Sequence, residues 1–193
     1  MAIRICEPPA GSRDVVWQHM QRRQAFNKVM AFDGGAALTA ANDLPLGPSF
    51  RIYTATRDNF FERRFLSDAI ETAWLYVIGS ADAPRGLAEL STRSPKGRAQ
   101  VEFASIYPRE LATAVLNAVA DAKVLNECGD YELRILRAPA LSFLAVWLYG
   151  AENLLIPVSA PNGLDGRHLV TEAEILTALQ PLAERRMRVS DVS

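Results

Sequence analysis

Histidine and cysteine are scarce in this chain of 193 residues, which contains two of each. His19, His168, Cys6 and Cys128 lie far apart in the sequence and match no spacing typical of a zinc site. Two cysteines cannot build a disulfide framework, and nothing in the sequence suggests that these two meet. We therefore expect no metal, no cofactor and two reduced thiols.

Long apolar runs are also missing. The longest, Leu141 to Tyr149, is interrupted by Ser142 and has about half of the ~20 residues that a membrane-spanning helix needs. Residues 1–10 carry charges and two prolines, and they lack the apolar segment of a signal peptide. We expect a cytoplasmic protein that does not enter a membrane.

An excess of charge of either sign is absent, because 21 basic and 22 acidic side chains give a net charge of -1. No overall field would attract nucleic acid. The pairs Arg22-Arg23 and Arg63-Arg64 lie on predicted helices and could form a basic face, but acidic residues are interspersed. Weak nucleic-acid binding through these four arginines is therefore a possible function, but it ranks below the two described at the end of this section.

What the chain does have is the composition of a globular protein, with 49% hydrophobic and 22% charged residues. Its length fits one domain, or one domain with an arm. Proline and glycine are concentrated in residues 36–49, which we interpret as a loop. We therefore expect an N-terminal arm and helix in residues 1–49 and a single α+β domain in residues 50–193.

Periodic patterns predict four helices and seven strands. The helices are expected at residues 13–31, 59–71, from Pro108 to about Leu125, and from Thr171, where Thr171 and Glu174 form a capping box. The strands are expected at residues 50–56, 73–78, 87–92, 98–107, 131–138, 141–149 and 154–158. Residues 73–78 could also continue the preceding helix, because short apolar runs are ambiguous.

The order of these elements indicates the fold class. Runs of strands joined by short turns favour one mainly antiparallel sheet of about five to seven strands, with helices packed on it. The segments Tyr131 to Leu141, Ala145 to Gly150 and Asn153 to Pro157, with the final helix, resemble the C-terminal half of uncharacterised bacterial proteins. The resemblance covers roughly residues 105–185 and implies no activity and no catalytic residue.

Aromatic side chains are the most suggestive candidates for a site. Trp74 and Tyr76, and likewise Trp147 and Tyr149, are two residues apart on predicted strands, so both rings of each pair share a face. If the two strands are neighbours, the four rings could line an apolar pocket or a partner surface. Arg134 and Arg137 are the nearest charged residues that could orient an acidic ligand, but they fall on opposite strand faces.

Two functions remain ahead of nucleic-acid binding. The first is a non-enzymatic binding or interaction module, whose apolar sheet face or pocket holds a small apolar ligand, a protein partner or a second copy of the chain. The second is a hydrolase that uses His168 as its base, because this histidine lies in a predicted loop. The acidic residues Asp130 and Glu132 are expected to be solvated near a helix end.

Overall fold

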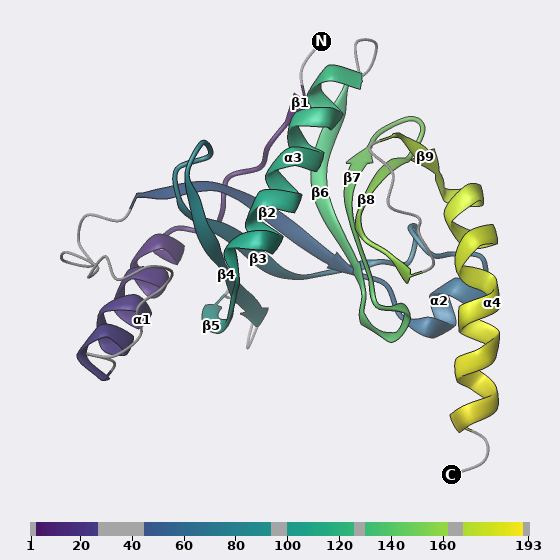
Figure 1. Cartoon of the computed structure of the whole chain (residues 1–193), viewed down its shortest axis with the longest axis horizontal. Coiled ribbons are helices and arrows are strands. Elements are labelled where there is room, and N and C mark those ends of the chain that lie inside the picture. Colours follow the sequence, from purple (N-terminus) through teal and green to yellow (C-terminus); the bar gives the residue numbers. More distant parts are fainter. Residues whose placement is uncertain (1–2, 27–44, 94–99, 126–129, 162–167, 191–193) are drawn as a thin grey trace. The chain divides into compact units, whose positions relative to one another are not determined.

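A computed structural model shows how the chain folds (Figure 1). It describes residues 3–26, 45–93, 100–125, 130–161 and 168–190. Its α-helices are α1 (Ser12–Phe26), α2 (Arg57–Phe61), α3 (Arg109–Leu125) and α4 (Glu172–Ser190). Its strands are β1 (Ile3–Arg4), β2 (Leu46–Thr54), β3 (Ile70–Gly79), β4 (Pro84–Arg93), β5 (Gln100–Tyr107), β6 (Tyr131–Ala138), β7 (Phe143–Tyr149), β8 (Leu154–Ser159) and β9 (Val170–Thr171).

The described segments form a mostly antiparallel sheet of nine strands, so the α+β class is confirmed. The sheet is larger than the five to seven strands expected. The two additional strands are β1 and β9, which have two residues each and are too short to show any alternation. Both become strands only because longer strands offer hydrogen-bonding partners: β1 pairs with β6, and β9 pairs with β8.

The chain divides into two compact units, each built from separate segments. The first unit contains Met1–Cys6, Phe50–Thr72 and Thr113–Ser193, and the second contains Glu7–Ser49 and Ala73–Ala112. The expected division into residues 1–49 and 50–193 stays a prediction. The loop predicted at residues 36–49 ends earlier than expected, because β2 already begins at Leu46. Residues 36–44 of this predicted loop lie outside the described part.

The second unit is a three-stranded meander with a helix. β3 pairs with β4 and β4 with β5, both antiparallel. Helix α1 contacts β4 and β5, and the His19 ring stacks on Phe103 with 3.4 Å between centroids. Gly79 ends β3 with φ of +98°, and a Cβ there would lie 2.5 Å from the carbonyl oxygen of Ala83. Only glycine fits this turn without strain.

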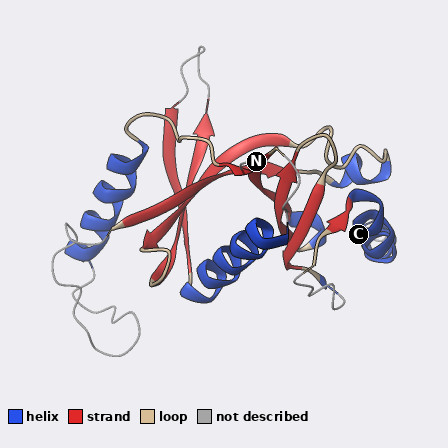
Figure 2. Ribbon diagram, turned by 90° about the horizontal axis from the view of Figure 1, so that it is seen from above, coloured by secondary structure: helices blue, strands red, loops and turns tan. Residues whose placement is uncertain are grey.

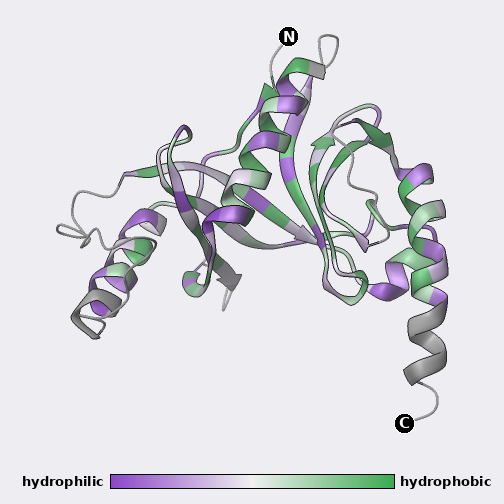
Figure 3. Ribbon diagram, viewed as in Figure 1, coloured by the Kyte–Doolittle hydropathy of each residue, from purple (hydrophilic) through white to green (hydrophobic). Residues whose placement is uncertain are grey.

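The first unit has β6 at its centre. β1 and β2 pair with β6 in parallel, whereas β7 pairs with it antiparallel and continues to β8 and β9. Figure 2, in which α4 is seen nearly end-on, shows that helix beside the strands of this unit. Figure 3 shows both hydrophilic and hydrophobic residues along α3 and α4, as expected of helices that bury one face.

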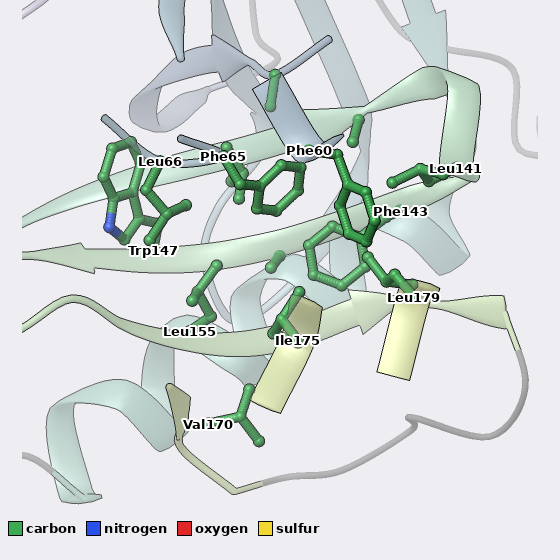
Figure 4. Packing of buried hydrophobic residues seen from close by; sticks show 14 of the residues in the cluster. Phe60, Phe65, Leu66, Leu141, Phe143, Trp147, Leu155, Val170, Ile175 and Leu179 are labelled. Atoms are coloured by element: carbon green, nitrogen blue, oxygen red, sulfur yellow. The ribbon is translucent and has the colours of Figure 1, made fainter. Parts of the chain in front are cut away.

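One large apolar cluster holds this unit together (Figure 4). It joins side chains from α2, the turn after it, β6, β7, β8 and α4. Its buried members include Phe60, Phe65, Leu66, Leu136, Leu141, Phe143, Trp147, Leu155, Val170, Ile175 and Leu179. The cluster covers one end of a sheet face, and this end therefore cannot serve as an open binding surface.

Helix α2 is much shorter than the helix expected at residues 59–71. Thr56 and Asn59 form its capping box, and the helix ends at Phe61. Arg63 then adopts a left-handed backbone conformation with φ of 55°. This turn lets Phe60, Phe65 and Leu66 all enter the cluster, which a continuous helix would not allow because they would lie on different faces.

Helix α4 begins as the sequence predicts. Thr171 Oγ1 and its backbone N–H both donate to Glu174 Oε2, at 2.9 and 2.7 Å, and the Glu174 N–H returns to Thr171 Oγ1. The helix runs through Pro181 without a break. Glu172 adds a tertiary contact, because its Oε1 accepts the Leu66 backbone N–H at 3.0 Å.

Candidate functional site

The four aromatic side chains singled out from the sequence all lie in strands. Residues 73–78 belong to β3, so the alternative of a continued helix is wrong. However, β7 hydrogen-bonds with β6 and β8, so it is not a neighbour of β3. Trp74 and Tyr76 also belong to the second unit, whereas Trp147 and Tyr149 belong to the first. The two pairs of rings therefore do not form one surface on adjacent strands.

Trp74 and Tyr76 are core residues of the second unit. Their exposed fractions are 1% and 0%. Burial raises the pKa of the Tyr76 hydroxyl. A ligand could reach neither ring without opening the core of this unit.

Trp147 and Tyr149 have a different environment, in the first unit. They share a sheet face, as expected from their spacing, and their ring centroids are 5.5 Å apart. Trp147 is buried, and its Nε1–H donates to Asn153 Oδ1 at 3.1 Å. Tyr149 is 44% exposed. The end of this sheet face beyond the apolar cluster is therefore aromatic and reached by solvent.

Arg134 lies at the centre of this aromatic end. It is directly opposite Trp147 in the pairing of β6 with β7. Its guanidinium carbon lies 3.6 Å from the ring centroid of Tyr149, 4.4 Å from that of Tyr53 and 5.1 Å from that of Trp147. These distances are in the range of cation–π contacts. We call Tyr53, Glu132, Arg134, Trp147 and Tyr149 the Arg134 cluster.

Glu132 fixes the guanidinium from the side. Its Oε1 accepts the Arg134 Nε–H at 2.9 Å, and it also lies 3.8 Å from Arg51 Nη1. Arg51 in turn lies 3.7 Å from Glu71. Only 12% of the Arg134 side chain and 18% of the Glu132 side chain are exposed. The expectation that Glu132 would be solvated near a helix end is wrong, because β6 places it beside two arginines.

The electrostatics of the cluster follow from this arrangement. Burial by itself would raise the pKa of Glu132, but the hydrogen bond and charge of Arg134 and the charge of Arg51 hold it below its ordinary value. Burial raises the pKa of the nearby Cys6 thiol, and the negative charge of Glu132 raises it further. Glu132 is therefore ionised at neutral pH and Cys6 is a neutral thiol with little nucleophilic character.

Arg137 lies on the opposite face from Arg134, as predicted. It is opposite Leu144 in the pairing of β6 with β7, three positions from Arg134. Alternation along the strand directs the two side chains to different sides of the sheet. Only Arg134 can therefore act together with Trp147 and Tyr149.

His168 is exposed and lies just before β9. Its charge contributes weakly to lowering the pKa of Glu174, after two larger contributions from hydrogen bonds with Thr171. The Thr171 hydroxyl, the nearest candidate nucleophile along the chain, donates to the Glu174 carboxylate and accepts the Glu174 N–H as the cap of α4. The geometry that a histidine base needs with a nucleophile is not present among these residues.

The remaining candidates are dispersed. Arg63 and Arg64 were expected on a helix, but they follow the end of α2. Arg64 pairs with Glu62 at 3.1 Å and with Asp68 at 3.5 Å. Arg22 is exposed on α1; Arg23 is also on α1, but its side chain is outside the described part. Cys128 likewise lies outside the described residues.

Two further findings concern the described residues only. They contain no group of three or more histidine, cysteine, aspartate or glutamate side chains that could hold a metal ion. None of their helices combines the length and apolar character needed to cross a membrane.

The sequence did not predict three residues of this site: Tyr53 and Glu132 in the Arg134 cluster, and Arg51 beside it. Tyr53 comes from β2, Arg51 lies two residues before it, and Glu132 lies two residues before Arg134. The Glu132–Arg134 spacing could have indicated a pair on one strand face. Tyr53 and Arg51 gave no such signal, because the parallel pairing of β2 with β6 is a tertiary feature.

Comparison with known proteins adds no further constraint. A scan against protein-family models, a search of curated proteins and a search of solved structures each found no match to this chain.

Proposed function

We propose that this chain is a non-enzymatic binding module and that the Arg134 cluster is its binding surface. The observation that carries the proposal is Tyr149, a tyrosine that is 44% exposed and lies 3.6 Å from a fixed arginine. Tyrosine, tryptophan and arginine are the residue types that contribute most to binding surfaces. Their gathering beside the exposed ring of Tyr149 favours recognition of a ligand or partner.

Rigidity supports the same proposal. Tyr53 and Tyr149 each contact Trp147 or Arg134, and Trp147 is anchored by its hydrogen bond to Asn153. Rings held in this way lose little conformational freedom when a ligand binds, which favours affinity. The occupant would cover the exposed part of Tyr149 and would contact the edge of the cluster, not the buried Trp147 ring.

The hydrolase with His168 as base has less support. His168 is exposed, and Thr171 and Glu174 near it are engaged with each other in the cap of α4. Nucleic-acid binding also has less support, because Arg64 is paired with two carboxylates and no aromatic stacking contact accompanies it among the described residues.

The test is a screen of small aromatic and apolar compounds by ligand-observed NMR on three proteins: the unmodified chain, Tyr149→Ser and Phe61→Ser. Phe61 is a matched control because it is also an exposed ring of the first unit, with 38% exposed. Compounds that bind should lose most of their affinity with Tyr149→Ser and keep it with Phe61→Ser.

Two results would contradict the proposal: no compound binds, or the compounds that bind do so equally well to Tyr149→Ser. Sedimentation of the same proteins examines a second copy of the chain as the occupant. If the unmodified chain and Phe61→Ser form a dimer and Tyr149→Ser is a monomer, the cluster is a self-association surface.

A further inference from the structure

Arg134 is held in one orientation by its neighbours. Glu132 accepts its Nε–H at 2.9 Å, and the rings of Tyr149 and Tyr53 lie 3.6 and 4.4 Å from the guanidinium carbon. Arginine normally loses several rotatable degrees of freedom when it binds an anion. Here that loss has already occurred on folding, so the guanidinium is preorganised for a ligand.

The outer nitrogens of this guanidinium, Nη1 and Nη2, keep some contact with solvent, although only 12% of the side chain is exposed. Among the described residues, no hydrogen-bond acceptor is found for Nη1 or Nη2, and neither is a fully buried atom. A guanidinium has five N–H donors in a planar fork, of which the contact with Glu132 uses the one on Nε. The other donors are therefore available to a ligand that approaches from solvent.

Charge selects the kind of anion. Arg51 and Arg134 are balanced by Glu71 and Glu132, with nitrogen–oxygen distances between 2.9 and 3.8 Å. Because these charges balance, the site has no net positive charge to offset the desolvation of a dianion, which costs more free energy than the desolvation of a monoanion. A carboxylate also matches the planar fork with two oxygens. The site therefore favours a carboxylate over a phosphate.

We infer that the binding surface recognises a small aryl carboxylate, whose two oxygens accept hydrogen bonds from Nη1 and Nη2 of Arg134 and whose ring packs on the exposed part of Tyr149. This inference rests on the proposed function and specifies its ligand class. Arg134 supplies the charge and the planar geometry, and Glu132 positions it without contacting the ligand.

The test is an NMR titration at neutral pH and moderate salt with three probes: benzoate, its neutral counterpart benzamide, and inorganic phosphate. Benzoate should bind at least about tenfold more tightly than benzamide, since hydrogen bonds to a charged group are the stronger ones. Phosphate should bind more weakly than benzoate. Benzoate should also shift the signals of residues 131–138 and 143–149.

Variants locate the effect. Arg134→Gln should reduce benzoate binding to the level of benzamide, and Arg134→Lys should give an intermediate affinity because it keeps the charge but lacks the fork. Arg85→Gln is the matched control, since Arg85 is an exposed arginine on β4, and it should leave the affinity unchanged. The comparison of benzoate with benzamide needs no variant and holds even if Arg134→Gln does not fold.

The outcomes separate this inference from the proposed function. If benzoate and benzamide bind with equal affinity, and both lose that affinity in Tyr149→Ser, the inference that the surface recognises a carboxylate is wrong. The proposed function of the Arg134 cluster as a binding surface is then still supported. Stronger binding of phosphate, or unchanged benzoate binding in Arg134→Gln, also overturns the inference. If no probe binds, the inference is wrong, and the compound screen with Tyr149→Ser decides the proposed function on its own.

Discussion

Glu132 is the residue at which burial and charge oppose each other most directly. Its side chain is 18% exposed, which disfavours its ionised form, yet Arg134 and Arg51 keep its pKa below the ordinary value of 4.5. A carboxyl whose pKa is lower in the folded state stabilises the protein above the pKa that it has in the unfolded state. That stabilisation is lost as the pH falls through the folded pKa.

We therefore expect Glu132→Gln to lower the free energy of unfolding at pH 7 by about 1–3 kcal/mol, because Arg134 loses the charged acceptor for its Nε–H. The difference between the two proteins should shrink as the pH is lowered below 4.5. Urea unfolding at a series of pH values measures both effects.

Glu71→Gln is the control for this experiment. Glu71 pairs with Arg51 at 3.7 Å but is 35% exposed, and exposed pairs contribute about 0–1 kcal/mol. An equal loss in the two variants, or a Glu132→Gln loss that stays constant down to acidic pH, would show that the Arg134 cluster does not hold Glu132 as described.

At the level of single elements, helix α4 has the clearest sequence signal. Thr171 caps it with its side-chain oxygen, and the capping box was predicted from the spacing of Thr171 and Glu174. Thr171→Ala should lower the free energy of unfolding by about 1 kcal/mol, within a range of roughly 0.5–2, because an N–H of the first turn loses its acceptor. Thermal or urea unfolding measures the change.

Thr177→Ala provides the matched control on the same helix. Its hydroxyl donates to the Ala173 carbonyl within the helix interior, where alanine has the higher helix propensity. This variant should be neutral or slightly stabilising. If Thr171→Ala were equally neutral, the cap would contribute nothing to the start of α4.

The long strands could be predicted because each repeats its pattern several times. Residues 131–138 alternate as expected, and Leu133 and Ile135 are buried on one face while Glu132 and Arg134 lie on the other. Helix α2 was predicted too long for a related reason. Phe61, Phe65 and Ala69 are spaced four apart, but burial of Phe60, Phe65 and Leu66 in the apolar cluster outweighs this local pattern.

On the scale of the whole molecule, the apolar cluster of the first unit joins residues that are far apart in the sequence, from Ala55 to Ala183. Leu179 on α4 is completely buried in it. Leu179→Ala should lower the free energy of unfolding by about 2–5 kcal/mol, because it removes apolar contacts and leaves a cavity. Urea unfolding followed by tryptophan fluorescence measures this loss.

Leu176→Ala is the corresponding control, because Leu176 lies on the same helix and packs against the cluster only partly buried. Leu176→Ala should lower the free energy of unfolding clearly less than Leu179→Ala does. Equal losses for the two leucines would mean that α4 does not pack on the strands through the face that contains Ile175 and Leu179.

The candidate site was predicted in part. Arg134, Trp147 and Tyr149 were identified from the sequence, because a spacing of two along a strand is enough to place side chains on a common face. Tyr53 and Arg51 could not be assigned to the same site, since they lie about 80 residues earlier and reach it only through the parallel pairing of β2 with β6. Trp74 and Tyr76 have the same spacing but are buried, because identical spacing does not show which face is covered.

The sequence by itself determined the local features: which segments alternate, which side chains share a strand face, and where α4 begins. These depend on contacts between residues a few positions apart, so they are encoded in short patterns. Tertiary structure alone decided which strands are neighbours, which aromatic rings are buried, and that Glu132 and three rings surround Arg134. Pairing between distant segments depends on the combined burial of the whole chain, and no short pattern specifies it.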